Sequence, residues 1–526
     1  MKCFYYSNNW VKTEAISVIS SFCFDDNNNF LTSEQIVSIL SNLKEKDDIK
    51  RFISRLNGLF AIIINFPNCK LLAIDKTRIY PLFYRFREGN LEVSDLSKSL
   101  MGFNSKIDKV SEEEYFYLGY TLQGKTLING IKQVKPACFL EFENNQIVEY
   151  EFYSMMVSQD EITSYSYDQC KEKFICILDK VFDRIVNNLN GRQVVVPLSG
   201  GYDSRLIISM LKNKGYTNVI SYTVGENMEQ EQQIAKKVAN ILEYPIYHID
   251  YSDENFIMQD FYSEEFRNMI DFVGSATNFM WLFEYNAIKW LQKENIMSKD
   301  AVFMPGHCGD FIAGSHFQKN DIIDKYSEQK IILNMLLNAF VEYNQSIKSF
   351  HLRNEIKKMF KENTSHKFLS YSIFLNFIMK NRLAQCINNS SRIYNFFEYN
   401  VIFPFWDTDI VDFFRCLPFE FLFKKKLYND VLENDIFVNL NLNFVEPPKD
   451  SLFFKKQKIK NILKIFLPRF IHLKCKGNID VLGEKYLTCE MVKELIDAGV
   501  MKDENDFLSQ NEIMKSWYLL YLKSQF

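Results

Sequence analysis

The fold is decided by the stretch Val194-Val195-Val196-Pro197-Leu198-Ser199-Gly200-Gly201-Tyr202-Asp203-Ser204-Arg205. Its β-branched residues predict a buried strand, and the apolar pattern after Gly201 predicts a helix. Gly200 and Gly201 permit a tight turn between the two, with backbone N–H groups that face inward beside the positive end of the helix. This arrangement predicts an anion site, and phosphate is the anion that suits it best.

Polar side chains of the same turn extend this prediction. The hydroxyls of Ser199 and Ser204 can donate hydrogen bonds to phosphate oxygens. The carboxylate of Asp203 repels bare phosphate, so we expect it to hold Mg²⁺ that bridges phosphate groups. The spacing is that of neither the Walker loop nor the dinucleotide motif G-x-G-x-x-G. It matches SGGxDS, the pyrophosphate-binding loop of ATP pyrophosphatases, which cleave ATP between its α- and β-phosphates.

Residues 166–526 are predicted to form an α/β domain with a helical C-terminal region. Strand patterns at 218–225 and 245–251 flank a helical pattern at 229–244, and a further strand at 301–310 runs into a loop. Because strands that alternate with helices form parallel sheets, we expect such a sheet here. Residues 320–526 are predicted to be mostly helical.

Residues 1–155 have a different pattern, which predicts a separate α+β domain. Short apolar runs at 58–65, 70–76 and 81–86, and an alternating pattern at 138–153, predict strands. The joint between the two domains is expected between residues 150 and 168.

The composition restricts the class of protein. Aromatic residues make up 15% of the 526 residues, which favours large buried cores over disorder. The net charge of -4 gives no general electrostatic basis for binding nucleic acid. Eleven cysteines without a CxxC pair predict free thiols rather than a disulfide scaffold. The sequence contains neither the apolar segment of a signal peptide nor an apolar run of about 18 residues. We therefore expect a cytoplasmic protein that does not insert into membranes.

A resemblance to a known family emerges from the same stretch. Pro197–Ile207, PLSGGYDSRLI, resembles the synthetase domain of the asparagine synthetase family. Other segments resemble motifs of that family and occur in its order, so that the resemblance covers nearly the whole chain. In the second domain these are 221–225, 305–314 (the family's G-x-G-x-D-E-x-x-x-G), 400–407 and 448–453; in the first they are 56–64 and 71–86 (the family's G-x-F-A and D-x-x-G-x-x-P-L-Y-Y).

The resemblance implies a fold and an activity. It implies an N-terminal Ntn-hydrolase-like, glutaminase-like domain at 1–155, followed by an asparagine synthetase-like ATP-pyrophosphatase domain at 166–526. In this family a carboxylate attacks the α-phosphate of ATP, acyl-AMP and pyrophosphate form, and a nitrogen nucleophile displaces AMP. The expected substrates are ATP with Mg²⁺, a small-molecule carboxylate and a nitrogen donor. A homodimer is an expected assembly.

The resemblance also implies roles for individual residues. Asp203 and Asp310 match the family's metal carboxylates, and Asp310 is also expected to act in catalysis. Lys449 matches the cation that stabilises the transition state. The residues expected to bind ATP and pyrophosphate are Leu198, Ser199, Gly200, Gly201, Asp203, Ser204, Thr223, Val224 and Gly306.

Two departures from the family pattern matter most for function. Arg205 replaces the second serine of SGGxDSS and either faces the nucleotide or caps the edge of the site. His307 and Phe311 stand where asparagine-forming enzymes carry glutamate. His307 is either a proton-transfer group near the acyl adenylate or a polar loop residue. The loss of these glutamates puts aspartate as the acceptor in doubt.

The first domain lacks the motifs of an active glutaminase. Such enzymes use an N-terminal cysteine whose free amine is its own general base. Here Lys2 precedes Cys3, and the R-L-S-I and N-G-E-x-Y-N segments that bind glutamine are not found. We therefore expect a degenerate glutaminase-like domain, in which Cys3 is a small core residue.

Three function classes remain open from the sequence. The first is an amide-forming ligase whose acceptor is aspartate or another carboxylate, as in relatives that close β-lactam or lasso-peptide rings or amidate surface sugars. The second is a non-catalytic, nucleotide-binding regulatory member of the family. The third is another ATP pyrophosphatase, such as a tRNA thiolation enzyme. That class predicts a basic RNA-binding face and paired catalytic cysteines, and the sequence offers neither.

Overall fold

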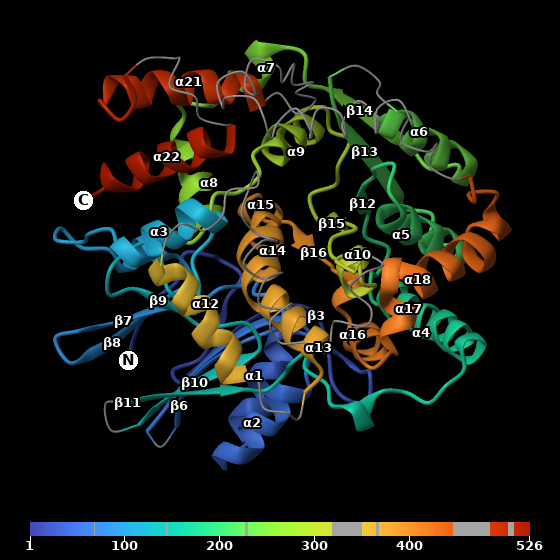
Figure 1. The fold of residues 1–526 in the computed structure, drawn as a ribbon, viewed down its shortest axis with the longest axis horizontal. Coiled ribbons are helices and arrows are strands. Elements are labelled where there is room, and N and C mark those ends of the chain that lie inside the picture. The colour runs from blue at the N-terminus through green and yellow to red at the C-terminus, as the bar shows by residue number, and fades with distance from the viewer. Residues whose placement is uncertain are drawn as a thin grey trace.

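The computed structural model describes residues 1–67, 69–143, 146–226, 230–317, 350–363, 368–444, 484–502 and 510–526. Its first part contains two β-sheets, drawn in blue and cyan in Figure 1, and its second part is built on a parallel sheet on the other side of the molecule. Among the described residues, no helix is both long and apolar enough to cross a membrane. The ten cysteines of the described part are free thiols, as expected.

The larger sheet of the first part has the strand order β11-β10-β6-β5-β3-β2, with β4 paired to β3. Its pairs are antiparallel, and β5–β6 confirms the expected strands at 58–65 and 70–76. The strands are β2 (Val11–Lys12), β3 (Ile16–Phe24), β4 (Phe30–Leu31), β5 (Asn57–Phe66), β6 (Cys69–Ile74), β10 (Cys138–Glu143) and β11 (Gln146–Glu151).

A smaller sheet, of order β1-β8-β7-β9, completes this part. Its strands are β1 (Lys2–Phe4), β7 (Phe83–Arg87), β8 (Asn90–Ser94) and β9 (Lys132–Gln133). Helices α1 (Ser33–Asn42) and α2 (Lys46–Arg55) bury their apolar faces against one side of the larger sheet. The other side of the larger sheet packs in a core that it shares with the smaller sheet. Helix α3 (Lys109–Leu118) lies between β8 and β9 in the sequence.

The second part confirms the expected parallel sheet, whose strand order is β14-β13-β12-β15-β16. The strands are β12 (Val194–Pro197), β13 (Val219–Gly225), β14 (Ile246–Asp250), β15 (Val302–Phe303) and β16 (Asn400–Val401), and every pair is parallel. The two-residue strand β16 lies in a region expected to be helical. A strand of two residues shows no alternation of apolar and polar residues, so β16 is recognised only by its pairing with β15.

Helices surround this sheet and fill the joint between the two parts. Near the sheet lie α4 (Tyr167–Asn187), α5 (Tyr202–Asn213), α6 (Gln230–Leu242), α7 (Glu254–Met258), α8 (Glu264–Gly274), α9 (Phe283–Lys293) and α10 (Gly309–Ile312). The later helices are α12 (Phe350–Asn363), α13 (Ser370–Ile378), α14 (Asn388–Ser390), α15 (Arg392–Phe396), α16 (Thr408–Arg415), α17 (Phe419–Leu422), α18 (Lys426–Val431), α21 (Glu484–Asp497) and α22 (Gln510–Lys523). In Figure 1, the gold helices α13 to α15 run between the blue sheets and the green parallel sheet.

The sheet order decides where chemistry can take place. Strands β12 and β15 are direct neighbours, with Val194 paired to Val302. Their carboxyl ends therefore lie side by side, and the loops that follow them are brought together at one edge of the sheet. In open α/β sheets this edge is where ligands bind.

Candidate functional site

The turn after β12 is tight, and several of its N–H and hydroxyl groups form hydrogen bonds with one another. Gly201 is the N-cap of α5, and its N–H donates to the Ser199 hydroxyl at 3.2 Å. The N–H of Ser199 donates to the Ser204 hydroxyl at 3.1 Å, and the two hydroxyl oxygens are also 3.1 Å apart. Leu198 donates its N–H to the carbonyl of Tyr222 in β13, which fixes the turn to the neighbouring strand. The predicted phosphate turn therefore opens a twelve-residue helix at the expected place.

The loop after β15 lies directly against this turn. A Cβ atom at Gly306 would lie 2.7 Å from the backbone nitrogen of Ser204. One at Gly309 would lie 2.8 Å from Cγ of Asp203. Because real Cβ atoms do not approach so closely, both positions require glycine. Gly306 is thus brought against the turn after β12 by a close approach of two backbones, and its contact with a nucleotide stays a prediction.

Two carboxylates meet where the loops touch. The N–H of Asp310 donates to Oδ2 of Asp203 at 2.8 Å. Burial, and then the charge of Asp310, raise the pKa of Asp203 to about 6. Asp310 itself is exposed to solvent. Residues 107 positions apart in the sequence, 203 and 310, therefore form one acidic pair.

This pair is suited to a divalent cation. Among the described residues, no group of three or more His, Cys, Asp or Glu side chains could hold a metal by protein ligands alone. Mg²⁺ usually binds one or two carboxylates and takes its other ligands from phosphates and water. Hard oxygen donors, a like-charge pair and an adjoining helix N-terminus fit that pattern, so Asp203 and Asp310 are the residues that would hold Mg²⁺ on a bound nucleotide.

Helix α18 and the turn before it supply two residues that sequence reasoning missed. Tyr428 donates its hydroxyl to Oδ1 of Asp203 at 2.7 Å. The charge of Lys425 acts on the same carboxylate and lowers its pKa against the effect of burial. Lys424 and Lys425 both have left-handed backbones, with φ of 57°. The run of three lysines at 424–426 was the available signal, but nothing in the sequence connects it with residue 203.

Arg205 lies behind the turn and not over the nucleotide side. Its guanidinium is completely buried and donates to the carbonyls of Gly200, Leu442 and Phe444 at 2.9 to 3.1 Å. It also stacks on the ring of Phe444, at 4.8 Å from the ring centre. Arg205 therefore braces the phosphate turn against the C-terminal region, a role that neither sequence interpretation described.

His307 is held in an aromatic environment beside the acidic pair. Its Nδ1 lies 2.8 Å from the hydroxyl of Ser391, and its ring contacts Trp281 and Phe403. Burial lowers the pKa of His307 to about 4. The imidazole is therefore neutral near pH 7. Phe311, the other departure from the family motif, is buried.

The remaining predicted residues divide into two groups. Thr223 and Val224 lie in β13, which neighbours the turn, and both are half-buried. The carbonyl of Val224 accepts a hydrogen bond from Gln232 of α6. Their contact with a nucleotide stays a prediction. Lys449 and the motif around it lie outside the described residues.

Comparison with known protein families identifies two segments of the chain. Residues 25–153 match the glutamine amidotransferase domain, and residues 178–497 match asparagine synthase. The second match covers more than half of the chain. The chain belongs to the asparagine synthase family. The two matches also confirm the expected order of a glutaminase-like domain followed by a synthetase domain. The predicted boundaries at 155 and 166 stay predictions.

Individual relatives are distant. Proteins named as glutamine-hydrolyzing asparagine synthetases of Mycobacterium bovis and Mycobacterium tuberculosis are 25% identical over 199 residues, 36% of this chain and 30% of theirs. The microcin J25-processing protein McjC of Escherichia coli is 25% identical over 189 residues, 35% of this chain and 34% of its own. The chain thus spans about a third of the length of the curated relatives it matches. A glutamine phosphoribosylpyrophosphate amidotransferase from B. subtilis has a TM-score of 0.18 at 10% identity over 56% of this chain and 62% of its own, which is too low to carry an argument.

The glutaminase-like domain holds Cys3 as an ordinary strand residue. Cys3 lies in the middle of β1 and pairs with Val93 of β8. Burial raises the pKa of its thiol. A raised pKa keeps the thiol protonated, which is the opposite of what a nucleophilic cysteine requires.

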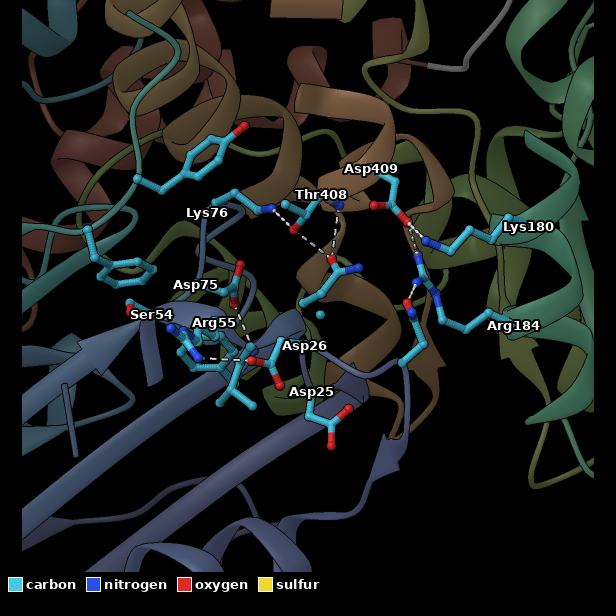
Figure 2. A pocket seen from close by; sticks show the side chains of 17 residues that line it. Asp25, Asp26, Ser54, Arg55, Asp75, Lys76, Lys180, Arg184, Thr408 and Asp409 are labelled. Carbon is cyan, nitrogen blue, oxygen red and sulfur yellow. Dashed lines mark hydrogen bonds and ion pairs between the residues drawn. The ribbon is translucent and has the colours of Figure 1, made fainter. Parts of the chain in front are cut away.

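A cavity of about 290 Å³ lies at the interface between the two domains (Figure 2). Positively and negatively charged residues line this cavity, and the ion pairs named next neutralise one another. Asp26 pairs with Arg55, Asp409 with Lys180 and Arg184, and Lys76 donates to Thr408. The first domain is joined across this cavity to α16 by Lys76, which donates to Thr408, and to α4 by Arg184, which donates to Asn28. We therefore assign the cavity to the domain joint rather than to the site.

The acidic pair gives a direct prediction. In Asp203→Ala combined with Asp310→Ala, turnover of ATP should fall by about 1000-fold, because the metal's stabilisation of phosphate charge is worth several kcal/mol. Circular dichroism and thermal melting should show a folded protein. The matched control is Asp250→Ala, an exposed carboxylate at the end of β14, which should retain wild-type turnover. Wild-type turnover in the double variant would remove the metal assignment.

The neutral state of His307 gives a second prediction. With a pKa near 4, His307 does not ionise between about pH 5.5 and 9. The pH dependence of kcat/KM for His307→Asn should therefore have the same shape as that of the wild type. Turnover should fall by less than about 10-fold, since loss of a general acid or base typically costs 100-fold or more. Disappearance of an ionisation between pH 6 and 7 would contradict this and assign proton transfer to His307.

Proposed function

We propose that this member of the asparagine synthase family is an ATP-dependent amide-forming ligase that activates a carboxylate as an acyl adenylate. The observation that supports this best is the contact between the two loops at the end of the parallel sheet, where Asp203 and Asp310 meet at the N-terminus of α5. Membership of the family supports a ligase in general terms, and the chemistry below is our proposal.

The proposed reaction has two steps. A carboxylate oxygen of the acceptor attacks the α-phosphorus of ATP, the bond to the β-phosphate oxygen breaks, and pyrophosphate leaves. A nitrogen nucleophile then attacks the acyl carbon, AMP leaves with the electron pair of the acyl–oxygen bond, and the nitrogen releases a proton. Both steps bring a nucleophile towards a negatively charged group, so they require positive charge and fixed hydrogen-bond donors.

Several residues suit these requirements. The N–H groups and hydroxyls at 199–204 would bind the departing pyrophosphate. Asp203 and Asp310 would hold Mg²⁺, which neutralises phosphate charge when bound. Lys425 is close enough to act on the charge of Asp203 and would stabilise the developing negative charge. Lys449, outside the described residues, is expected to act as a further cation.

The acceptor is proposed to differ from free aspartate. Asparagine-forming enzymes carry glutamate at the positions of His307 and Phe311. A neutral imidazole between Trp281 and Phe403 offers no negative charge to the ammonium group of an amino acid. This favours a carboxylate that belongs to a larger molecule, such as a peptide side chain.

Free ammonia or an amine of a co-substrate is proposed as the nitrogen source. The active cysteine of a glutaminase has a free α-amine as its base, whereas Cys3 lies inside β1 behind the peptide nitrogen that links it to Lys2. The first domain is then retained for a purpose other than glutamine hydrolysis.

The test of the ligase is pyrophosphate release from ATP and Mg²⁺ with a panel of carboxylates, containing aspartate, N-acylated amino acids and short acidic peptides, each with ammonium. Release should require a carboxylate and should be faster with a peptide than with aspartate. The Asp203→Ala/Asp310→Ala variant provides the background. Binding of ATP without release for every member of the panel would support a regulatory, non-catalytic protein instead.

The nitrogen source is tested by glutamate formation from glutamine. Purified protein should form glutamate at the background rate, and Cys3→Ala should not change that rate. Ammonium should support amide formation in both proteins. Robust hydrolysis that is lost in Cys3→Ala would show that Cys3 becomes exposed with a free amine, and the proposed role of the first domain would be wrong.

A further inference from the structure

A short turn of the first domain is bonded to the synthetase domain at three consecutive residues. We call residues 75–78, which follow β6, the docking turn. Lys76 donates to the Thr408 hydroxyl of α16, the Thr77 carbonyl accepts from Asn388 at 3.0 Å, and Arg78 donates to Oδ1 of Asn389 at 2.9 Å. All four residues of the turn are buried.

The docking turn is rigid because Asp75 organises it. The carboxylate of Asp75 accepts hydrogen bonds from the N–H and hydroxyl of Thr77, from the N–H of Arg78 and from the N–H of Phe60 in β5. A carboxylate that accepts four donors fixes the backbone around it. The positions of Thr77 and Arg78 are therefore set by the sheet of the first domain.

The same short helix, α14, holds the loop that carries Asp310. Asn388 accepts a hydrogen bond from the thiol of Cys308 at 3.6 Å while it donates to Thr77. Ser391, just after α14, contacts Nδ1 of His307 at 2.8 Å. A chain of hydrogen bonds thus runs from Thr77 through Asn388 to Cys308 in the loop at 305–310, and the next residue of α14, Asn389, binds Arg78.

At both ends of this series of hydrogen bonds, a residue with a side chain has a backbone conformation that favours glycine. Arg78 has φ of 60° and Cys308 has φ of 72°, in the left-handed region that L residues avoid. The family motifs quoted above have glycine at both positions. Two separate replacements of this kind, one in each domain, contact adjacent asparagines of α14.

Besides its left-handed backbone, Arg78 has a buried charged side chain that lowers the stability of the fold. Its guanidinium is fully buried, and Nε and Nη2 have no hydrogen-bond partner among the described residues. Burial and the nearby charge of Arg392 lower the pKa of Arg78. Stability alone would favour glycine here, because a buried guanidinium with unpaired N–H groups is unfavourable.

We propose that the docking turn positions the 305–310 loop through α14, so that the first domain controls the geometry of Asp310 at the ligase site. Arg78 and Cys308 are positioning residues in this scheme and contact no substrate. The effect on turnover rests on the proposed function, whereas the mechanical link between the domains does not.

The link is tested by a double-mutant cycle with Arg78→Gly and Cys308→Gly in the full chain. Glycine suits the backbone at both positions, so the variants should fold. We expect each single variant to lower kcat for pyrophosphate release by about 10-fold and to change KM for ATP by less than about 2-fold. The double variant should lose little more than either single one, because both act through α14. Independent, multiplied losses would overturn the proposal.

Two further variants control for simple destabilisation. Arg78→Met keeps most of the side-chain volume and removes the hydrogen bond to Asn389, so it replaces Arg78→Gly if that variant does not fold. Tyr153→Phe removes a hydrogen bond of 2.8 Å from the first domain to Asp412, which does not pass through α14. It should leave kcat within about 2-fold of the wild type. An equal loss of kcat in Tyr153→Phe would mean that any weakening of the joint suffices.

Hydrogen exchange provides a readout that needs no substrate. The N–H of Asp310 is bonded to Asp203, so peptides that contain 305–313 report how firmly the loop is docked. In Arg78→Gly these peptides should exchange at least about 5-fold faster than in the wild type, and in Tyr153→Phe they should not. Unchanged exchange at 305–313 in Arg78→Gly would overturn the link. Absence of pyrophosphate release from the wild type would instead overturn the proposed function.

Discussion

The half-buried carboxylate of Asp203, with a second carboxylate beside it, is the constraint on which the site depends. Burial and the negative charge of Asp310 both oppose its ionisation, and the pKa rises to about 6 as a result. The hydroxyl of Tyr428, the N–H of Asp310 and the charge of Lys425 favour the ionised form. These donors do not cancel the effects of burial and of the second carboxylate, and the proposed Mg²⁺ would supply the missing positive charge.

The rest of the architecture follows from bringing those groups together. Asp203 opens α5, Asp310 comes from the loop after β15, and Tyr428 lies in the helical C-terminal region. Gly306 allows a close approach to the backbone of the β12 turn, and Gly309 leaves room for the carboxylate of Asp203. Arg205 binds the turn from behind to residues 442 and 444. The parallel sheet positions the first two elements, and α18 in the C-terminal region contributes the hydroxyl of Tyr428.

The first domain matches an amidotransferase domain, and its connections to the second domain are extensive. Cys3 is a paired strand residue whose thiol has a raised pKa, and polar contacts connect the domain to α4, α14 and α16. Many of these contacts are buried, such as those of Arg78 and Lys76. Buried polar groups specify one arrangement of the two domains, because any other arrangement would leave them without partners. A domain held in this way can act on the neighbouring site without any reaction of its own.

Local sequence patterns are sufficient to predict the parts of the fold whose residues are neighbours in the chain. The β-branched run before Ser199, the two glycines and the helical spacing after them are neighbours in the chain, so they predict the phosphate turn directly. The strand patterns that alternate with helical patterns further along the chain predict the parallel sheet. The resemblance of the 305–314 segment to a known motif paired Asp310 with Asp203. Tertiary structure alone decided that Tyr428 donates to Asp203, that Arg205 lies behind the turn, and that residues 76–78 contact α14 and α16. These contacts join residues more than 200 positions apart, and no local pattern carries that information, because only the packing of the helices against both sheets brings them within hydrogen-bonding distance.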